Sequence, residues 1–187
     1  GQKFYTDVGA ELYNQKDLER AKALLANAGY NGEKVVIATN STYDTMYKAA
    51  LVMSEQMRAA GINVELSVTD WATQLKRRKG PGYNYWTGGW PLPASGPVQG
   101  MSIFANDLNF NNLPAVDEQL ETAWQDLNRA DTDDKIHNAV ERMQRRVYDQ
   151  AYLINFGTMD ILQGTRSKVR GFVPFPNFRF WNVWLEN

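Results

Sequence analysis

Residues 34–68 decide the fold, and they read KVVIATNSTYDTMYKAALVMSEQMRAAGINVELSV. The run 34–39 is rich in β-branched residues, which predicts a strand buried on both faces. Across 42–60 apolar residues recur at helical spacing, and Gly61 then ends the helix. Residues 62–68 alternate apolar and polar side chains, as a half-exposed strand does. This strand–helix–strand order predicts a parallel or mixed sheet with helices packed on its faces.

Further helices are predicted on either side of this unit. Upstream, Asn14 and Asp17 are spaced like a capping pair before an apolar pattern over residues 16–28. Downstream, Asp70 is placed to cap a short helix that ends in the basic run Lys76–Lys79. Basic residues in a last helical turn are favoured by the helix dipole, so we interpret this run as a solvated helix end.

A third strand is predicted within residues 83–97, which read YNYWTGGWPLPASGP. The aromatic run favours a strand over 83–88 that stops at the Gly-Gly pair. The three prolines that follow oppose both helix and central strand, so an irregular loop is expected there. Trp86 and Trp90 would then form a stacking platform for a ligand, or both would cap the sheet as core residues.

The second half of the chain reads as two helices followed by short strands. One helix is expected over 116–128, with its apolar residues along one face, and a second over 132–150, capped by Asp131. An aromatic tail ends the chain, and so many uncovered aromatic residues indicate that the tail docks on another surface. Short strands are expected over 151–156, 161–163 and 169–173, and the aromatic tail covers 172–185.

Composition limits the classes of function. The 187 residues suit one domain, and 43% hydrophobic with 22% charged residues is ordinary for a globular protein. The formal net charge of −1 gives no electrostatic footprint for nucleic acid, so no nucleic-acid partner is predicted. The chain has no cysteine and a single histidine, His137, which excludes thiolate sites and sites that need several imidazoles.

An enzyme is the least favoured class. Asp70, Asp107, Asp117 and Glu118 are candidates for the paired carboxylates of a glycoside hydrolase. Asp70 and Asp117 stand at helix starts, however, where a carboxylate is more simply a cap. No Ser/His/Asp order surrounds His137, and the Gly-Gly pair is not a phosphate loop. We therefore predict no catalytic residue, no cofactor and no bound metal.

Several phrases follow one another in order along the chain. They are Tyr13-Asn14, Ala21-Lys22-Ala23-Leu24-Leu25, Ala28-Gly29-Tyr30, Gly32, Gly61-Ile62-Asn63-Val64, Trp71, Gly89-Trp90-Pro91, Val116-Asp117 and Val169-Arg170-Gly171-Phe172. Together they resemble the extracellular solute-binding proteins of peptide and nickel ABC importers, over nearly the whole chain. Each phrase alone is weak, and their shared order makes the resemblance specific.

The resemblance implies an α/β fold that forms one lobe of a periplasmic-binding-protein clamshell. Members of the family are longer, so this chain is expected to be the C-terminal lobe. Residues 1–155 would be the ligand-binding lobe, and residues 156–187 would be strands and a tail that pack toward the missing N-terminal lobe. The implied location is periplasmic, or extracellular and membrane-anchored in an organism without an outer membrane. The implied partners are a small-molecule solute and the permease subunits of an ABC transporter.

The resemblance also places the ligand site at two loops, residues 40–44 and 88–96. The expected aromatic walls are Tyr43, Trp86 and Trp90. The expected hydrogen-bonding groups are Asn40, Ser41 and Ser95 with the backbone of Gly88 and Gly89.

Two departures from the family narrow the ligand. Dipeptide-binding members carry an arginine just before the tyrosine of the first loop, where this chain has Asn40-Ser41-Thr42. They also carry an aspartate soon after the tryptophan of the second loop, whereas in this chain the first acidic residue after Trp90 is Asp107. A zwitterion fixed at both ends would leave its charges unpaired. The expected ligand is a neutral or singly charged peptide, peptide-like, opine or sugar-like compound, and nickel is not supported.

Two further expectations concern the chain by itself. The main rival interpretation is a stand-alone aromatic module that binds carbohydrate or peptide. If the chain is instead half of a clamshell, its uncovered aromatic tail would favour self-association.

Overall fold

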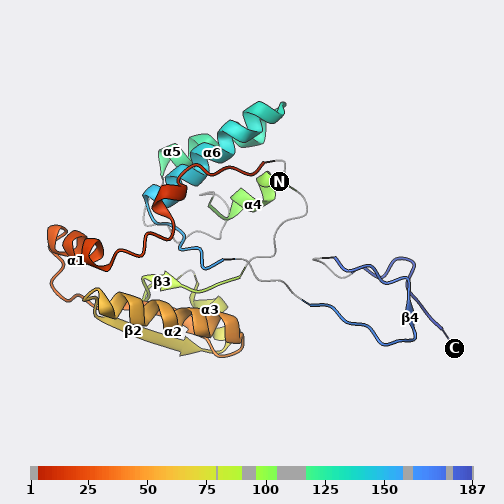
Figure 1. The fold of residues 1–187 in the computed structure, drawn as a ribbon, viewed down its shortest axis with the longest axis horizontal. Coiled ribbons are helices and arrows are strands. Elements are labelled where there is room, and N and C mark those ends of the chain that lie inside the picture. The colour runs from red at the N-terminus through yellow and green to blue at the C-terminus, as the bar shows by residue number, and fades with distance from the viewer. Residues whose placement is uncertain are drawn as a thin grey trace.

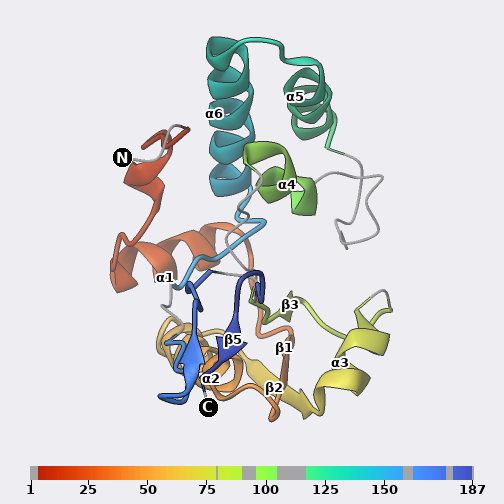
Figure 2. The same cartoon turned by 90° about the vertical axis from the view of Figure 1, so that its right-hand side faces the viewer.

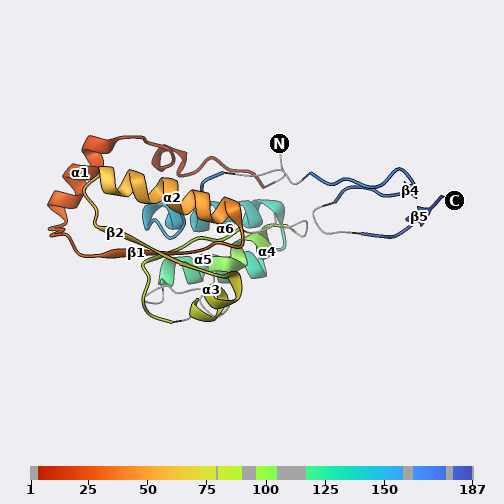
Figure 3. The same cartoon turned by 90° about the horizontal axis from the view of Figure 1, so that it is seen from below.

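The structure is a computed structural model that describes residues 4–78, 80–89, 96–104, 117–157, 162–175 and 179–186. Figure 1 shows a small sheet flanked by helices, with a second group of helices beside it. Two short C-terminal strands lie apart from both groups in Figures 1 and 3. The architecture is therefore mixed α/β, as the sequence predicts.

The sheet is parallel, with the strand order β2-β1-β3. Its strands are β1 (Val35–Asn40), β2 (Val64–Thr69) and β3 (Tyr85–Trp86). Ile37 lies opposite Leu66 on one side and opposite Tyr85 on the other. The three predicted strands and their common sheet are confirmed, although β3 is shorter than the predicted range.

The helices α2 (Asp44–Ala59) and α3 (Trp71–Arg77) cover opposite faces of this sheet (Figures 2 and 3). Under α2 the sheet forms an apolar core of Ile37, Ala50, Met53 and Val64. Burial of each larger side chain in this core contributes about 2 kcal/mol to the free energy of folding. As predicted, Asp70 caps α3 by accepting a hydrogen bond from the Thr73 N–H at 3.0 Å.

Before the sheet, a short 3-10 helix η1 (Ala10–Leu12) precedes α1 (Leu18–Asn27). Asp17 caps α1 through the Arg20 N–H at 2.9 Å. The prediction that Asn14 takes part in this cap is wrong, because Asn14 has a left-handed backbone (φ 57°) before the helix. Asn tolerates that conformation, so this residue turns the chain instead of capping it.

The segment after β3 contains a helix that the prolines were expected to prevent. The helix α4 (Pro97–Met101) is followed by the 3-10 helix η2 (Ser102–Phe104). Pro97 stands in the first turn of α4, where its missing N–H removes no helical hydrogen bond. The prediction that the third proline opposes a helix is therefore wrong at Pro97, whereas residues 90–95 of the predicted loop lie outside the described residues.

A second core lies between α5 (Glu118–Arg129) and α6 (Asp133–Asp149). The predicted apolar face of α5 is confirmed, and its buried residues pack on those of α6. Thr132 caps α6 through the Lys135 N–H, so the predicted cap Asp131 is wrong. Asp131 instead pairs with the Lys135 Nζ at 2.7 Å. The buried members of this core are Leu120, Ala123, Trp124, Leu127, Ala139, Val140, Met143 and Val147.

The strand predicted over 151–156 does not form. Ala151 has a left-handed backbone (φ 52°), and the Tyr152 N–H donates to the Val147 carbonyl at 3.1 Å. This hydrogen bond folds the chain back over the end of α6, in the manner of a helix C-cap. The residue pattern favoured a strand, but none of the strands that the structure describes pairs with this segment.

The C-terminal tail forms a short antiparallel pair, β4 (Val169–Arg170) and β5 (Trp184–Leu185). Of the other predicted tail strands, residues 162 and 163 are not in a strand and residue 161 lies outside the described residues. Trp181 is 77% exposed and Trp184 58% exposed. None of the helices described is both long enough and apolar enough to cross a membrane.

Candidate ligand-binding site

The candidate site that the two predicted loops indicate lies where the parallel strands β1 and β3 end. Strand β1 connects through α2 to β2 on one side, whereas β3 pairs with its other side. Connections that leave in opposite directions create a crevice at the carboxyl ends of the strands, which is where open α/β sheets bind ligands. The two predicted ligand loops follow these two strands.

Three aromatic side chains pack together at this edge. The ring of Tyr43 meets Trp71 edge-on at 5.2 Å between centroids, and Trp71 meets Trp86 at 5.9 Å with the rings tilted by 43°. Tyr43 is 45% exposed, so its outer surface is available. The structure thus brings Tyr43 and Trp86 together, through a residue that sequence reasoning did not place in the site.

Trp71 joins the cluster because the loop after β2 is tied to the loop after β1. The Trp71 N–H donates to the Thr42 Oγ1 at 3.1 Å, and the Ser41 N–H donates to the Thr69 carbonyl at 2.9 Å. The signal for this neighbour was present in the sequence. A tryptophan directly after the cap Asp70 begins a helix at the carboxyl edge of the sheet.

Trp86 lies over the backbone that follows it. A Cβ atom on Gly88 would come within 2.2 Å of the Trp86 ring, so only glycine fits there. The Trp86 Nε1 is buried and has no hydrogen-bond partner within the described part of the chain. Trp86 is therefore a half-buried ring whose buried indole N–H makes no hydrogen bond to the described residues.

The predicted hydrogen-bonding groups divide between surface and interior. Ser41, Gly88 and Gly89 are exposed, in agreement with a role at a cleft surface. Asn40 is fully buried: its Oδ1 accepts from the Tyr43 N–H at 2.8 Å, and its Nδ2 donates to the Gln74 Oε1 at 2.7 Å. Its side chain is thus engaged within the protein.

The remaining two predicted site residues, Trp90 and Ser95, lie outside the described residues. Their contribution to ligand binding therefore stays a prediction, as do those of the other residues named for the site.

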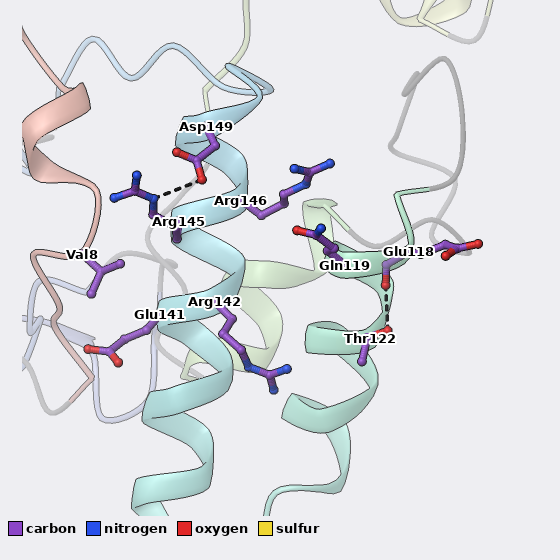
Figure 4. A pocket seen from close by; sticks show the side chains of 9 residues that line it. All are labelled: Val8, Glu118, Gln119, Thr122, Glu141, Arg142, Arg145, Arg146 and Asp149. Atoms are coloured by element: carbon purple, nitrogen blue, oxygen red, sulfur yellow. Dashed lines mark hydrogen bonds and ion pairs between the residues drawn. The ribbon is translucent and has the colours of Figure 1, made fainter.

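A second hollow of about 680 Å³ lies over α6, between α5 and the N-terminal segment (Figure 4). Three arginines line it, and each is paired within the chain. Arg142 contacts Asp126 at 2.7 Å, Arg145 contacts Asp149 at 3.1 Å and also Glu11, and Arg146 contacts Asp117 at 2.7 Å. The positive charges of this hollow are thus engaged in ion pairs within the chain.

Asp117 is the most constrained carboxylate near this hollow. Its Oδ1 accepts from the Gln119 and Leu120 N–H groups, each at 3.1 Å, and its Oδ2 accepts from Arg146 and the Tyr152 hydroxyl, each at 2.7 Å. Burial alone would raise the pKa of Asp117, but these hydrogen bonds together hold it below its usual value. The hydrogen bond to Asp117 raises the pKa of the Tyr152 hydroxyl.

These contacts bear on the alternative of an enzyme. Asp70 and Asp117 are helix caps, as expected, and Glu118 is exposed at the start of α5. Asp107 lies outside the described residues. The His137 Nε2 lies 3.1 Å from the Glu141 Oε1 on the surface of α6. Within the described ranges no group of three or more acidic, histidine or cysteine side chains is placed to hold a metal ion.

With this geometry established, the comparisons with known proteins decide the family. Residues 1–112 match the family described as bacterial extracellular solute-binding proteins, family 5 Middle. The chain belongs to this family. The matched range contains the whole sheet and the loops that form the candidate site.

Individual relatives agree with this assignment. A probable peptide ABC transporter periplasmic-binding protein of Sinorhizobium fredii is 39% identical over 62 residues, which are 33% of this chain and 12% of that protein. A putative peptide binding protein AppA from Clostridium difficile has a TM-score of 0.75 at 19% identity, over 98% of this chain and 40% of its own. A periplasmic oligopeptide-binding protein from Thermotoga maritima, solved with mannohexaose bound, has a TM-score of 0.65 at 18% identity, over 78% of this chain and 32% of its own.

At these identities the two solved structures show the fold alone, and that fold is a periplasmic binding protein's. The predicted family and the predicted α/β class are therefore confirmed. This family member spans 40% or less of the length of each relative described above.

Proposed function

We propose that this chain is the C-terminal lobe of the substrate-binding component of an ABC importer for peptides or peptide-like solutes. The observation that carries the proposal is its membership of the extracellular solute-binding family, together with an aromatic site at the carboxyl edge of its sheet. The S. fredii relative is described as a peptide transporter component, which supports the same class of ligand.

The ligand that fits this edge is neutral or singly charged. The predicted loops 40–44 and 88–96 contain one charged residue, Asp44, which is exposed and pairs with Lys48 at 2.6 Å. The rings of Tyr43, Trp71 and Trp86 offer an apolar surface. Aromatic walls with a few polar groups suit peptide backbones, opines and sugars alike. The T. maritima protein is described as oligopeptide-binding and holds mannohexaose, which supports this range of ligands.

The greater length of the relatives supports the organisation that we propose. Residues 1–155 form the ligand-binding lobe, and residues 156–187 pack toward an N-terminal lobe that this chain lacks. The complete protein is periplasmic, or extracellular and membrane-anchored, and delivers its solute to permease subunits. It catalyses no reaction. The exposed rings of Trp181 and Trp184 support docking of the tail, and in this chain alone they favour self-association.

The test compares this chain with the longer parent protein, using three probes in calorimetric titrations. The probes are N-acetyl-trialanine amide, free dialanine and mannohexaose. We expect the parent to bind the neutral peptide or the sugar more tightly than dialanine, and this chain to bind any of them at least about a thousandfold more weakly. Trp90→Ala in the parent should weaken binding.

Two outcomes would contradict the proposal. Equal and tight binding by chain and parent would make the chain a complete module, which is the stand-alone alternative. Binding of dialanine alone, with free termini required, would overturn the assignment of a neutral ligand. Mass spectrometry of whatever copurifies with the parent would then identify the solute directly.

A further inference from the structure

One buried side chain connects the two loops of the candidate site. Gln74 is 1% exposed and is the only buried residue that the structure describes within α3. A glutamine in this position must satisfy both ends of its amide, because an unpaired buried polar group costs about 1–3 kcal/mol. The partners that satisfy it come from β1 and from the residue after β3.

On one side Gln74 holds the loop after β1. Its Oε1 accepts from the Asn40 Nδ2 at 2.7 Å, and the Asn40 Oδ1 accepts from the Tyr43 N–H at 2.8 Å. Asn40 is 0% exposed, so water does not substitute for either bond. The Asn40 Nδ2 also lies 3.3 Å from the Met46 Sδ, but sulfur is a weak acceptor, so the bond to Gln74 is the stronger link that holds the Asn40 amide and, through it, the Tyr43 backbone.

On the other side Gln74 holds the end of β3. Its Nε2 donates to the Thr87 carbonyl at 3.0 Å and lies 3.4 Å from the Ala38 carbonyl. The Thr87 side chain is itself anchored, since its hydroxyl donates to the Thr39 Oγ1 at 2.8 Å. Gly88 and Gly89, the exposed backbone of the second loop, follow Thr87 directly.

We propose that Gln74 is a positioning residue that fixes the distance between Tyr43 and the Gly88–Gly89 backbone, and so sets the width of the ligand site. This inference rests on the proposed function for its consequence in binding, but the coupling itself exists without a ligand. Hydrogen bonds are directional, so an amide that bridges two loops restricts the distance between them to a smaller range than apolar packing would. An apolar residue here would leave both the Asn40 Nδ2 and the Thr87 carbonyl short of a partner.

The coupling is measured by amide hydrogen exchange in this chain. Gln74→Met keeps the length of the side chain and removes both bonds, so we expect the Tyr43 amide to exchange about tenfold faster. The Ser41 amide is the internal control, because it lies in the same loop but donates to Thr69. Gln56→Met, at an exposed position of α2, is the control variant and should change neither amide.

A second variant separates positioning from a general loss of stability. In Gln74→Glu, an ionised carboxylate faces the Thr87 and Ala38 carbonyls and cannot donate to them, whereas a protonated carboxyl can. Burial raises the pKa of such a carboxyl. A carboxylate oxygen still accepts from the Asn40 Nδ2, so the Tyr43 amide should keep its protection at both pH values. The Thr87 amide, which donates to the Ala38 carbonyl at 3.0 Å, should lose protection at about pH 8 and recover it as the pH falls to about 5, while the wild type keeps its protection throughout.

Binding of N-acetyl-trialanine amide to the longer parent is then measured with the same variants. We expect Gln74→Met to weaken binding about tenfold and Gln74→Glu to bind better at low pH. The inference would be overturned, whatever the ligand, if Gln74→Met raised the exchange rates of the Tyr43 and Ser41 amides by the same factor. It would also be overturned if the Thr87 amide of Gln74→Glu showed no pH-dependent recovery of protection. A coupled Tyr43 amide with unchanged binding would instead show that these loops do not bind the ligand, which refutes the proposed site and not the bridge.

Discussion

Replacing Asp117 by Ala and by Asn will separate two contributions of one buried carboxylate to stability. The Oδ1 of Asp117 caps α5, and its Oδ2 binds Arg146 and the Tyr152 hydroxyl. The side chain of Asp117 is 3% exposed and that of Arg146 is 27% exposed. The carboxylate thus joins the start of α5, the end of α6 and the segment that folds back after α6.

The expected magnitudes follow from these contacts. Asp117→Ala removes the cap, worth about 1 kcal/mol, and leaves a half-buried guanidinium without its partner. Removing one member of a buried pair costs about 3–5 kcal/mol, and the partial exposure of Arg146 places the loss of this pair at about 3 kcal/mol. With the cap included, Asp117→Ala should therefore cost about 4 kcal/mol. Asparagine caps helices as well as aspartate does but also leaves Arg146 without an anionic partner, so Asp117→Asn should cost about 3 kcal/mol, which is about 1 kcal/mol less than Asp117→Ala.

The assay is thermal and urea unfolding of the purified chain, followed by circular dichroism. For a chain of this size, about 1 kcal/mol corresponds to about 2–4 °C in Tm, so the two variants should be resolved from each other. Asp126→Asn is the matched control, because its pair with Arg142 is exposed and worth less than about 1 kcal/mol. Equal losses in the Ala and Asn variants, or a loss in Asp117→Ala no larger than that of the control, would refute this account.

Three further predictions follow from the same structure. Because the pKa of folded Asp117 is lowered, its contribution should be present above about pH 4 and lost as the pH falls further, and Asp117→Asn should lack this part of the acid sensitivity measured by urea unfolding. Leu120→Ala, at a fully buried position between α5 and α6, should lower the free energy of unfolding by about 3 kcal/mol, against less than about 1 kcal/mol for Leu51→Ala, which is 37% exposed; similar losses would contradict the separate helical core. Gly171→Ala should open the β4–β5 pair, since φ is 73° and the new Cβ would lie 2.0 Å from the Asn182 carbonyl; undiminished amide protection across that pair would contradict it.

Local patterns were sufficient to predict the regular elements near the sheet. The β-branched run of β1, the alternation in β2 and the cap Asp70 depend on residues close in sequence, so they could be recognised without the fold. The same holds for the apolar face of α5, whose spacing alone indicates one buried side. The order of the family phrases likewise needed only the sequence, and it identified the solute-binding family.

Where prediction failed, a competing local conformation prevailed. The residues after α6 have strand-like composition, but Ala151 takes a left-handed backbone and the Tyr152 N–H bonds to the Val147 carbonyl, so these residues cap the helix instead. The prolines after β3 suggested an irregular loop, but Pro97 fits the first turn of a helix.

The interior of the candidate site was decided by tertiary structure. Asn40 was expected at the ligand surface because the family resemblance places the ligand at loop 40–44, and its actual partner Gln74 lies 34 positions further along the chain. Nothing in the local pattern of a short polar helix indicates that its glutamine spans two strands, and Trp71 likewise joins Tyr43 and Trp86 only once the sheet is assembled. Sequence spacing fixes which elements form, whereas a hydrogen bond or ring contact between distant residues needs a fixed distance and direction, which only the packed elements supply.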